Sequence, residues 1–373
     1  MLYLCYSDGF LSYDFGPAHP LNPRRLSLTY DLISESGVLD APDVRLVKPV
    51  PCSEADLISV HSKEYIKAVQ AERPNLAFGL GDEDTPVFQG MYDAARLIAG
   101  GSIQAAERLV EDDCSCFNLG GGLHHAVPSR AGGFCIFNDP ALAILVLRRK
   151  FHRILYIDID AHHCDGVQEI FYRDPEVLKI SIHESGRYLF PGTGFIEEIG
   201  CDEGLGYCVN IPMPRNSGDD AYEKAFEEIV PVLFSFFKPD AVVAQLGVDT
   251  HYSDCLTSLK MTVDGYLRLV GRIKKLADIY SGGRILALGG GGYSLPAVPV
   301  AWASALQVLR GMEPESVPCR WVELFSNETG LCPIFLPDRA PLVREDVSER
   351  IDLQLNETLS GLKSIISDVH GIF

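Results

Sequence analysis

The pattern of apolar and polar residues alternates along the chain between segments typical of strands and segments typical of helices, and this alternation predicts an α/β fold. Short apolar runs typical of strands alternate with longer stretches whose apolar residues recur at helical spacing. The candidate strands are Leu2–Tyr6, Cys116–Leu119, Ile154–Asp160, Leu178–His183, Tyr207–Ile211, Ala241–Gly247 and Ile285–Gly289. The candidate helices include Thr85–Val110, Pro140–Lys150, Asp220–Phe237, Val263–Tyr280 and Val298–Arg310. Runs 241–246 and 284–288 are apolar on both faces, which indicates a parallel sheet covered by helices on both sides.

The pattern contains no internal repeat, low-complexity tract or linker, so we expect residues 1–373 to form one domain. A tail from about Glu313 begins with several prolines, which predicts a loop, and then predicts a charged helix over Val347–Val369. No apolar run reaches the length of a membrane span, and Met1–Tyr6 lacks the basic start of a signal peptide. We therefore expect no membrane association.

Composition and charge narrow the function classes. The 373 residues are 47% hydrophobic and 22% charged, as in ordinary globular enzymes. A net charge of −19 argues against direct nucleic-acid binding and is compatible with a cationic substrate. The 11 cysteines are scattered without a CxxC pair, which predicts reduced thiols in a cytoplasmic protein. Cys114 and Cys116 are expected to alternate in a buried strand rather than bind a metal, and nothing specifies an oligomeric state.

Polar residues follow several predicted strands, at the edge where open α/β sheets bind their ligands. The segments concerned are Gly120–His125, Asp158–His162, Asp249–His251 and Gly289–Tyr293. In the second segment Asp158, Asp160 and His162 alternate, so an extended chain points all three to one face. Buried charge at this density requires pairing or a metal ion.

A metal site is the interpretation that these clusters favour. Asp160, His162 and Asp249 offer one nitrogen and two carboxylates, a set that suits catalytic Zn²⁺ and also Fe²⁺. Such an ion lowers the pKa of a bound water from about 15.7 to about 7. A single cluster would more simply cap a nearby helix, but clusters at several strand ends favour the metal.

Two further groups provide candidate acid–base and oxyanion chemistry. His124 and His125 follow three glycines, where they can transfer protons, and Asp158 and Asp165 are candidates to orient them. Tyr293 follows four glycines, where its phenol can donate a hydrogen bond to an oxyanion. This glycine run lacks both the Lys-Ser/Thr of a P-loop and the spacing of a dinucleotide fingerprint.

These motifs together resemble the arginase/deacetylase superfamily and, within it, the class I histone deacetylase-like branch. The motifs are Gly121–His125, Gly133–Asp139, Asp158–Val167 and Gly289–Tyr293. Ser181–Gly194 and Gly79–Phe88 are similar to the bacterial acetoin-utilisation deacetylases of that branch. The resemblance spans roughly residues 1–311 and leaves 312–373 to pack on the catalytic domain. It implies an eight-stranded, mostly parallel sheet flanked by helices.

The resemblance also implies an activity, cofactors and residue roles. The reaction would be hydrolysis of ε-N-acetyl-lysine in an acetylated protein, such as acetyl-CoA synthetase. Zn²⁺ or Fe²⁺ would bind Asp160, His162 and Asp249. His125 with Asp165 would be the main acid–base pair, and His124 with Asp158 would assist. Tyr293 would polarise the acetyl carbonyl. Asp84, Gly133, Phe134, Phe190 and Leu256 would contact the substrate, and Arg25 would line an internal acetate channel. Structural K⁺ would bind near Asp158, Asp160, His162, Ser181 and Ile182, and again near Phe171, Asp174, Val177 and Tyr207.

Departures from the superfamily's patterns and competing functions leave specific questions. Cys164 replaces a common glycine without touching an assigned role, and Gly247 stands where a second catalytic metal would need a carboxylate, which favours one metal. The first rival function is acetylpolyamine amidohydrolase. Leu256 occupies the place of its acidic gatekeeper and argues against it, whereas the acidic run 82–84 argues for it. A non-catalytic acyl-lysine scaffold is a remoter alternative, because such a protein would be expected to lose a metal ligand or the tyrosine, whereas all of these residues are present here.

Overall fold

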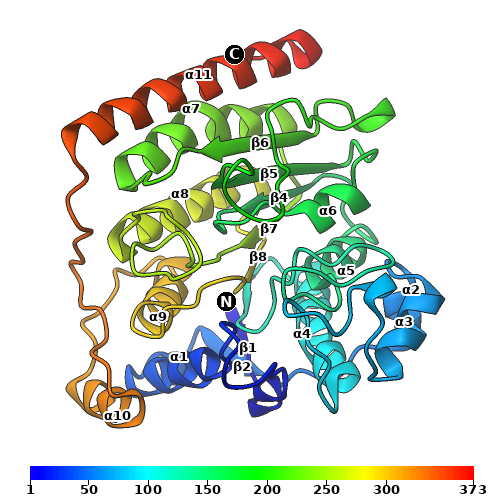
Figure 1. The fold of residues 1–373 in the computed structure, drawn as a ribbon, viewed down its shortest axis with the longest axis vertical. Helices are drawn as coiled ribbons and strands as arrows, with labels where there is room; N and C mark the ends of the chain where they lie inside the picture. The colour runs from blue at the N-terminus through cyan, green and yellow to red at the C-terminus, as the bar shows by residue number, and fades with distance from the viewer.

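The computed structural model describes residues 1–373 and contains one eight-stranded sheet (Figure 1). Every neighbouring pair of strands is parallel, and the strand order is β2-β1-β3-β8-β7-β4-β5-β6. The strands are β1 (Leu2–Cys5), β2 (Val44–Val47), β3 (Ser115–Asn118), β4 (Ile154–Asp158), β5 (Val177–Glu184), β6 (Cys208–Met213), β7 (Ala241–Gln245) and β8 (Ile285–Leu288). The predicted α/β fold with a parallel sheet is confirmed. Strands β3, β8, β7 and β4, distant in sequence, lie side by side at the centre.

Burial explains which strands the sequence predicted. Every residue of β3, β4, β5, β7 and β8 is buried, and β4, β7 and β8 are almost continuously apolar, as burial on both faces requires. Cys116 lies in β3 and Cys114 directly precedes this strand; both are buried, their Sγ atoms are 3.9 Å apart, and all cysteines are free. Strand β2 was not among the predicted strands. It lies at the sheet edge and exposes Arg45 and Leu46, so its sequence has no continuous buried pattern.

Helices cover both sides of the strands. They are α1 (Arg24–Glu35), α2 (Glu54–Ile58), α3 (Lys63–Gln70), α4 (Met91–Glu111), α5 (Asp139–Leu147), α6 (Asp165–Ile170), α7 (Asp219–Phe237), α8 (Val263–Ser281), α9 (Val298–Leu309), α10 (Cys319–Thr329) and α11 (Glu345–His370). Figure 1 shows α1, α9 and α8 to the left of the strands, α4, α5 and α6 to the right, and α7 above β6, next to α11. The predicted helical start at Thr85 is wrong. Helix α4 begins only after Gly90, whose φ of +81° is left-handed and interrupts the helix.

The C-terminal tail contains two helices rather than one. Helix α10 lies in the part predicted as a loop, and this prediction is corrected: Trp321 and Phe325 are buried against the body of the protein, and the Trp321 indole donates to the Leu28 carbonyl at 3.1 Å. The predicted final helix is present as α11, which contacts α7 and β6 and lies beyond that edge of the sheet in Figure 1. No helix combines the length and the hydrophobicity that crossing a membrane requires.

Candidate active site

Three candidate metal ligands converge at the carboxyl edge of the sheet. Asp160 and His162 follow β4, and Asp249 follows its neighbour β7. All three are buried, and one donor atom from each lies within 4.8 Å of the others. His162 Nδ1 is 2.9 Å from Asp249 Oδ2 and 3.1 Å from Asp160 Oδ1. The parallel register of adjacent strands thus brings together residues almost 90 positions apart.

The electrostatics of this cluster fit a cation. Asp160 and Asp249 are almost fully buried. Burial, and next the charge of Asp160, raise the pKa of Asp249 to about 8. Two buried carboxylates beside one imidazole remain ionised together only with added positive charge. The donor types and their spacing therefore fit one divalent ion such as Zn²⁺ or Fe²⁺.

Neighbouring strands orient the ligand carboxylates. Asp160 Oδ2 accepts hydrogen bonds from Gln245 Nε2 at 2.7 Å and from the Gly291 backbone at 2.7 Å. Asp249 Oδ1 accepts from the Ala161 backbone at 2.7 Å. The sequence analysis missed Gln245, although a glutamine inside the apolar run of β7 is a usable signal. A side chain at Gly291 would collide with the Asp249 carboxylate, which explains the glycine there.

The two histidines form separate pairs with two aspartates, as expected from the sequence. His124 Nδ1 is 2.7 Å from Asp158 Oδ2, and His125 Nδ1 is 2.6 Å from Asp165 Oδ1. Burial opposes charge on His124, but Asp158 and Asp160 outweigh it and raise its pKa to about 9. Burial, and next the charge of His124, lower the pKa of His125 to about 4. The Nε2 atoms of His124 and His125 lie 3.0 Å apart, so two imidazoles of different basicity are in direct contact.

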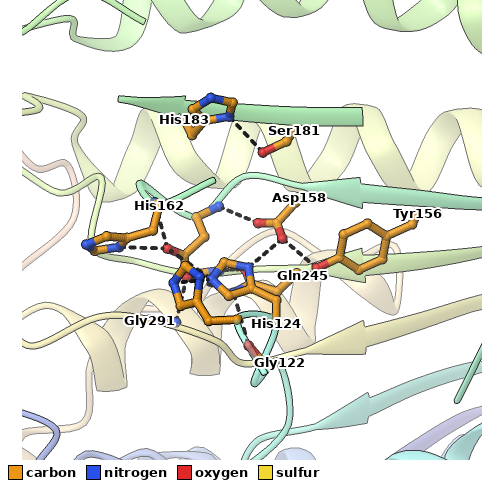
Figure 2. Close-up of polar contacts among 12 residues, drawn as sticks. Gly122, His124, Tyr156, Asp158, His162, Ser181, His183, Gln245 and Gly291 are labelled. Carbon is orange, nitrogen blue, oxygen red and sulfur yellow. Dashed lines mark hydrogen bonds and ion pairs between the residues drawn. The ribbon is translucent and has the colours of Figure 1, made fainter. Parts of the chain in front are cut away.

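Further polar residues support these pairs and were missed in the sequence. The Tyr156 hydroxyl donates to Asp158 Oδ2, the oxygen that also faces His124 (Figure 2). Asp139 accepts from the Gly122 and Leu123 backbones, at 3.0 and 2.8 Å, and orients the glycine turn before the histidines. The signal for Asp139 was present, since it ends the motif at 133–139.

Tyr293 lies in the same pocket as the histidines, Asp160 and Arg25. Its backbone N–H donates to Asp254 Oδ2 at 2.8 Å. Arg25 is buried and its Nη1 donates to the carbonyls of Gly290 and Gly292, at 2.8 and 3.0 Å. Burial, and next the Asp249 charge, raise the pKa of Tyr293 well above its ordinary value, so the phenol remains a donor.

The predicted substrate-contacting residues surround the pocket to different degrees. Phe134 lines the pocket with a strained φ of +66°, and its carbonyl accepts from the Tyr13 hydroxyl at 2.7 Å. Gly133 donates its N–H to Asp84 Oδ2 at 2.6 Å, so this carboxylate also fixes the Phe134 turn. Phe190 is 46% exposed, and its ring centroid lies 5.0 Å from that of His125. Hence both phenylalanines lie beside reactive groups.

Leu256 lies in the loop after β7 and is not among the residues that line this pocket. It is partly exposed, and its backbone N–H donates to Asp254 Oδ1 at 2.9 Å. Leu256 thus follows, by two residues, the aspartate that accepts the Tyr293 backbone N–H.

The two expected potassium sets differ. In the first set, Asp158 pairs with Ser181 across β4 and β5, and the Ser181 hydroxyl is 2.8 Å from His183 Nδ1 (Figure 2). In the second set, the buried Lys179 ammonium donates to the Phe171 carbonyl at 2.6 Å and lies 3.4 Å from the Asp174 carbonyl.

The Lys179 ammonium occupies part of the second expected potassium set, which comprises Phe171, Asp174, Val177 and Tyr207. Two of these carbonyls already face a cation that belongs to the chain. The Tyr207 carbonyl accepts the Lys179 backbone N–H at 2.9 Å. A buried ammonium and a potassium ion that shared these carbonyl oxygens would repel one another.

The parallel sheet, the buried Asp-His-Asp set and the paired histidines define the arginase/deacetylase fold class. Residues 19–309 match the histone deacetylase domain family, and the chain belongs to that family. It is therefore a deacetylase-type hydrolase.

Particular relatives narrow this assignment. The chain is 42% identical to the acetoin utilization protein AcuC of Bacillus subtilis strain 168, over 89% of this chain and 87% of the relative. It is 38% identical to AcuC of Staphylococcus xylosus, over 85% of each. Among solved structures, an HDAC homolog from Aquifex aeolicus superposes with a TM-score of 0.82 at 32% identity, over 94% of this chain and 99% of that one. An HDAC homolog complexed with SAHA superposes equally well, at 33% identity and over 94% and 98% of the two chains.

Proposed function

We propose that the chain hydrolyses ε-N-acetyl-lysine in an acetylated protein to lysine and acetate, with Zn²⁺ or Fe²⁺ bound by Asp160, His162 and Asp249. The observation that carries this proposal is geometric: one pocket is lined by His124, His125, Tyr293 and Asp160, and Asp160 belongs to the buried set of three candidate metal ligands. Amide hydrolysis requires these elements: a Lewis acid, a proton carrier and an oxyanion donor.

Each group has a distinct part in this reaction. When bound, the divalent ion would supply Lewis-acid polarisation and would lower the pKa of a water molecule. His125, which is neutral near pH 7, would accept the proton that water loses as its oxygen bonds to the acetyl carbon, and would deliver it to the lysine nitrogen as the C–N bond breaks. His124, paired with Asp158, contributes positive charge beside the developing oxyanion. Tyr293 donates a hydrogen bond to that oxygen.

The proposed substrate channel uses the remaining predicted residues. Phe134 and Phe190 would enclose the aliphatic part of acetyl-lysine, and Leu256 would present an apolar entrance. Asp84 would contact the substrate backbone with the oxygen that Gly133 leaves free. Arg25 would line the exit for acetate, because its guanidinium is buried in the same pocket.

One structural potassium ion is proposed rather than two. It would bind near Asp158, Asp160, His162, Ser181 and Ile182, where polar atoms of adjacent strand ends collect. At the second set, Lys179 supplies the positive charge instead. We further propose a cytoplasmic location, for which the free cysteines are the support, and acetyl-CoA synthetase as one candidate target by likeness to the acetoin-utilisation relatives.

The rival substrate is an acetylated polyamine, for which the acidic run 82–84 would be the attraction. Two of these carboxylates already have partners, since Asp82 accepts the Thr85 backbone at 2.8 Å and Asp84 accepts that of Gly133. This occupation, together with Leu256 at the gatekeeper position, favours acetyl-lysine.

Acetate release from an acetyl-lysine peptide and from an acetylated polyamine, measured side by side on Zn²⁺-loaded protein, tests the proposal. We expect a higher kcat/KM for the peptide. Preference for the polyamine would replace the proposed substrate. Absence of turnover with both substrates, in protein shown to contain the metal, would contradict the acetyl-lysine assignment.

A further inference from the structure

A chain of hydrogen bonds joins the C-terminal segment to the loop that carries Tyr293. Asp338 Oδ2 lies 2.8 Å from His251 Nε2. His251 Nδ1 lies 2.8 Å from the hydroxyl of Ser253, and that hydroxyl is 2.7 Å from the hydroxyl of Ser294. Ser294 directly follows Tyr293, so a residue far along the chain is connected to the catalytic tyrosine's neighbour.

The donor and acceptor groups of the partners determine the direction in which each of these hydrogen bonds is donated. Asp338 is a carboxylate that only accepts, so His251 Nε2 carries a hydrogen and donates it. The Ser253 backbone N–H also points at Nδ1, at 3.2 Å, which makes Nδ1 an acceptor. The Ser253 hydroxyl therefore donates to Nδ1 and accepts from Ser294. Hydrogen bonds that run in one direction toward a carboxylate strengthen one another.

Burial and further contacts fix the end of the chain at Asp338. The side chains of His251 and Asp338 are 2% and 4% exposed. The other oxygen of Asp338 accepts from the Tyr252 hydroxyl at 3.0 Å, and Oδ2 also accepts the Val263 backbone N–H at 3.1 Å, at the start of α8. The carboxylate thus has little freedom to move.

The same C-terminal segment contacts the Tyr293 loop a second time. The Ile334 backbone N–H donates to the Pro296 carbonyl at 3.0 Å, three residues after Tyr293. The Asp338 backbone N–H donates to Asp264 in α8. Residues 334–338 therefore bridge α8 and the segment that follows the catalytic tyrosine.

The Tyr293 loop needs such external support. Four glycines precede the tyrosine, and glycine leaves the backbone free to adopt many conformations. Arg25 and Asp254 hold the backbone on the amino side of Tyr293 and at its own N–H. The Ser294 hydroxyl provides the corresponding restraint on the carboxyl side.

We propose that Asp338 and His251 are positioning residues, which hold the Tyr293 phenol in its catalytic position through Ser253 and Ser294. This inference rests on the proposed function, because Tyr293 is assigned its oxyanion role there. Misplacement of a catalytic group by about 1 Å can lower a rate ~100-fold, and loss of one restraint among several should cost less.

The test measures kcat and KM of Zn²⁺-loaded Ser253→Ala and Asp338→Ala proteins with an acetyl-lysine peptide, in the wild-type and Tyr293→Phe backgrounds. Ser253 is exposed and its replacement removes only the middle of the chain, so this variant should fold even if Asp338→Ala does not. The matched control is Ser258→Ala, in the same loop, whose hydroxyl donates to Glu184 at 2.5 Å instead.

We expect both variants to lower kcat by ~10-fold with an unchanged metal content and KM, and the control to match wild type. In the Tyr293→Phe background neither substitution should lower kcat further, because the group that they position has been removed. A wild-type kcat in Ser253→Ala, or an equal loss in both backgrounds, would overturn the inference. A Tyr293→Phe protein as active as wild type would instead overturn the proposed function of Tyr293.

Discussion

Replacement of Tyr293 by phenylalanine removes one hydroxyl and leaves the rest of the site in place. The ring would keep its edge-to-face contact with Phe134, whose centroid is 5.7 Å away. The backbone N–H would still donate to Asp254. We therefore expect the variant to keep its thermal midpoint and its metal content.

The expected kinetic effect follows from the environment of that hydroxyl. Tyr293 shares its pocket with Asp160, and burial keeps its phenol protonated across the working pH range. A fixed donor in a water-poor site contributes about 2.7–4 kcal/mol to oxyanion stabilisation, so its loss should lower kcat by roughly 10²–10³-fold. Because the donor acts on charge that develops in the transition state, KM should change much less than kcat.

Steady-state kinetics with an acetyl-lysine peptide, combined with metal analysis of the same preparation, measure this effect. A kcat within threefold of wild type at full metal content would refute the oxyanion role. Loss of the metal in this variant would instead refute the assumption that metal binding does not depend on the Tyr293 hydroxyl.

Three other substitutions test the remaining assignments. Asp249→Ala should lose the divalent metal and turnover while its far-ultraviolet circular dichroism stays native; normal metal content would remove Asp249 from the ligand set. Lys179→Met leaves the Phe171 carbonyl without its donor, so we expect the variant to lose about 1–3 kcal/mol of unfolding free energy in choline chloride. In KCl the variant should recover part of this loss, whereas the stability of wild type should not depend on which of the two salts is present. Equal losses in both salts would show that no cation replaces the ammonium. Burial tends to raise the pKa of Asp338, but the His251 hydrogen bond counteracts burial and holds this pKa below its ordinary value of about 3.9. The ionised carboxylate therefore stabilises the fold above about pH 3.9, and this stability is lost as the pH falls through the pKa of the folded state. Asp338→Asn should accordingly be less stable than wild type at pH 7 in urea unfolding, and a difference that does not shrink below about pH 4 would contradict the pairing.

The sequence predicted the central part of the fold because burial there is uniform. Strands such as β4 and β7 are covered on both faces, and their continuous apolar runs report this directly. Edge strand β2 and helix α10 were not predicted, since each exposes part of its surface and depends on a partner elsewhere in the chain. For α10 that partner includes the Leu28 carbonyl, almost 300 residues away, which no local pattern reveals.

The candidate metal ligands and the paired histidines were accessible from sequence for the opposite reason. Asp160 and His162 are polar residues at the end of a buried strand, where only a special function compensates for desolvation. The pairing of His125 with Asp165 needed the resemblance to a known family, because spacing alone left either aspartate available to either histidine. The internal cation at Lys179 needed the structure, since a lysine in a strand pattern gives no sign of which carbonyls it faces.

The residues that orient the site are harder to predict than the residues that react, and the sheet explains why. A reacting group must face the pocket, so it follows a strand end, where its polarity contrasts with the apolar run before it. An orienting group acts from a neighbouring element: Gln245 reaches Asp160 from the next strand, and Asp338 reaches His251 from the C-terminal tail. Its polarity is satisfied by a partner distant in sequence, so even where a contrast exists, as at Gln245 in the apolar run of β7, the sequence does not show which residue it orients. Hydrogen-bond partners of predicted catalytic residues are therefore the positions at which a structure adds most to the sequence of a parallel α/β enzyme.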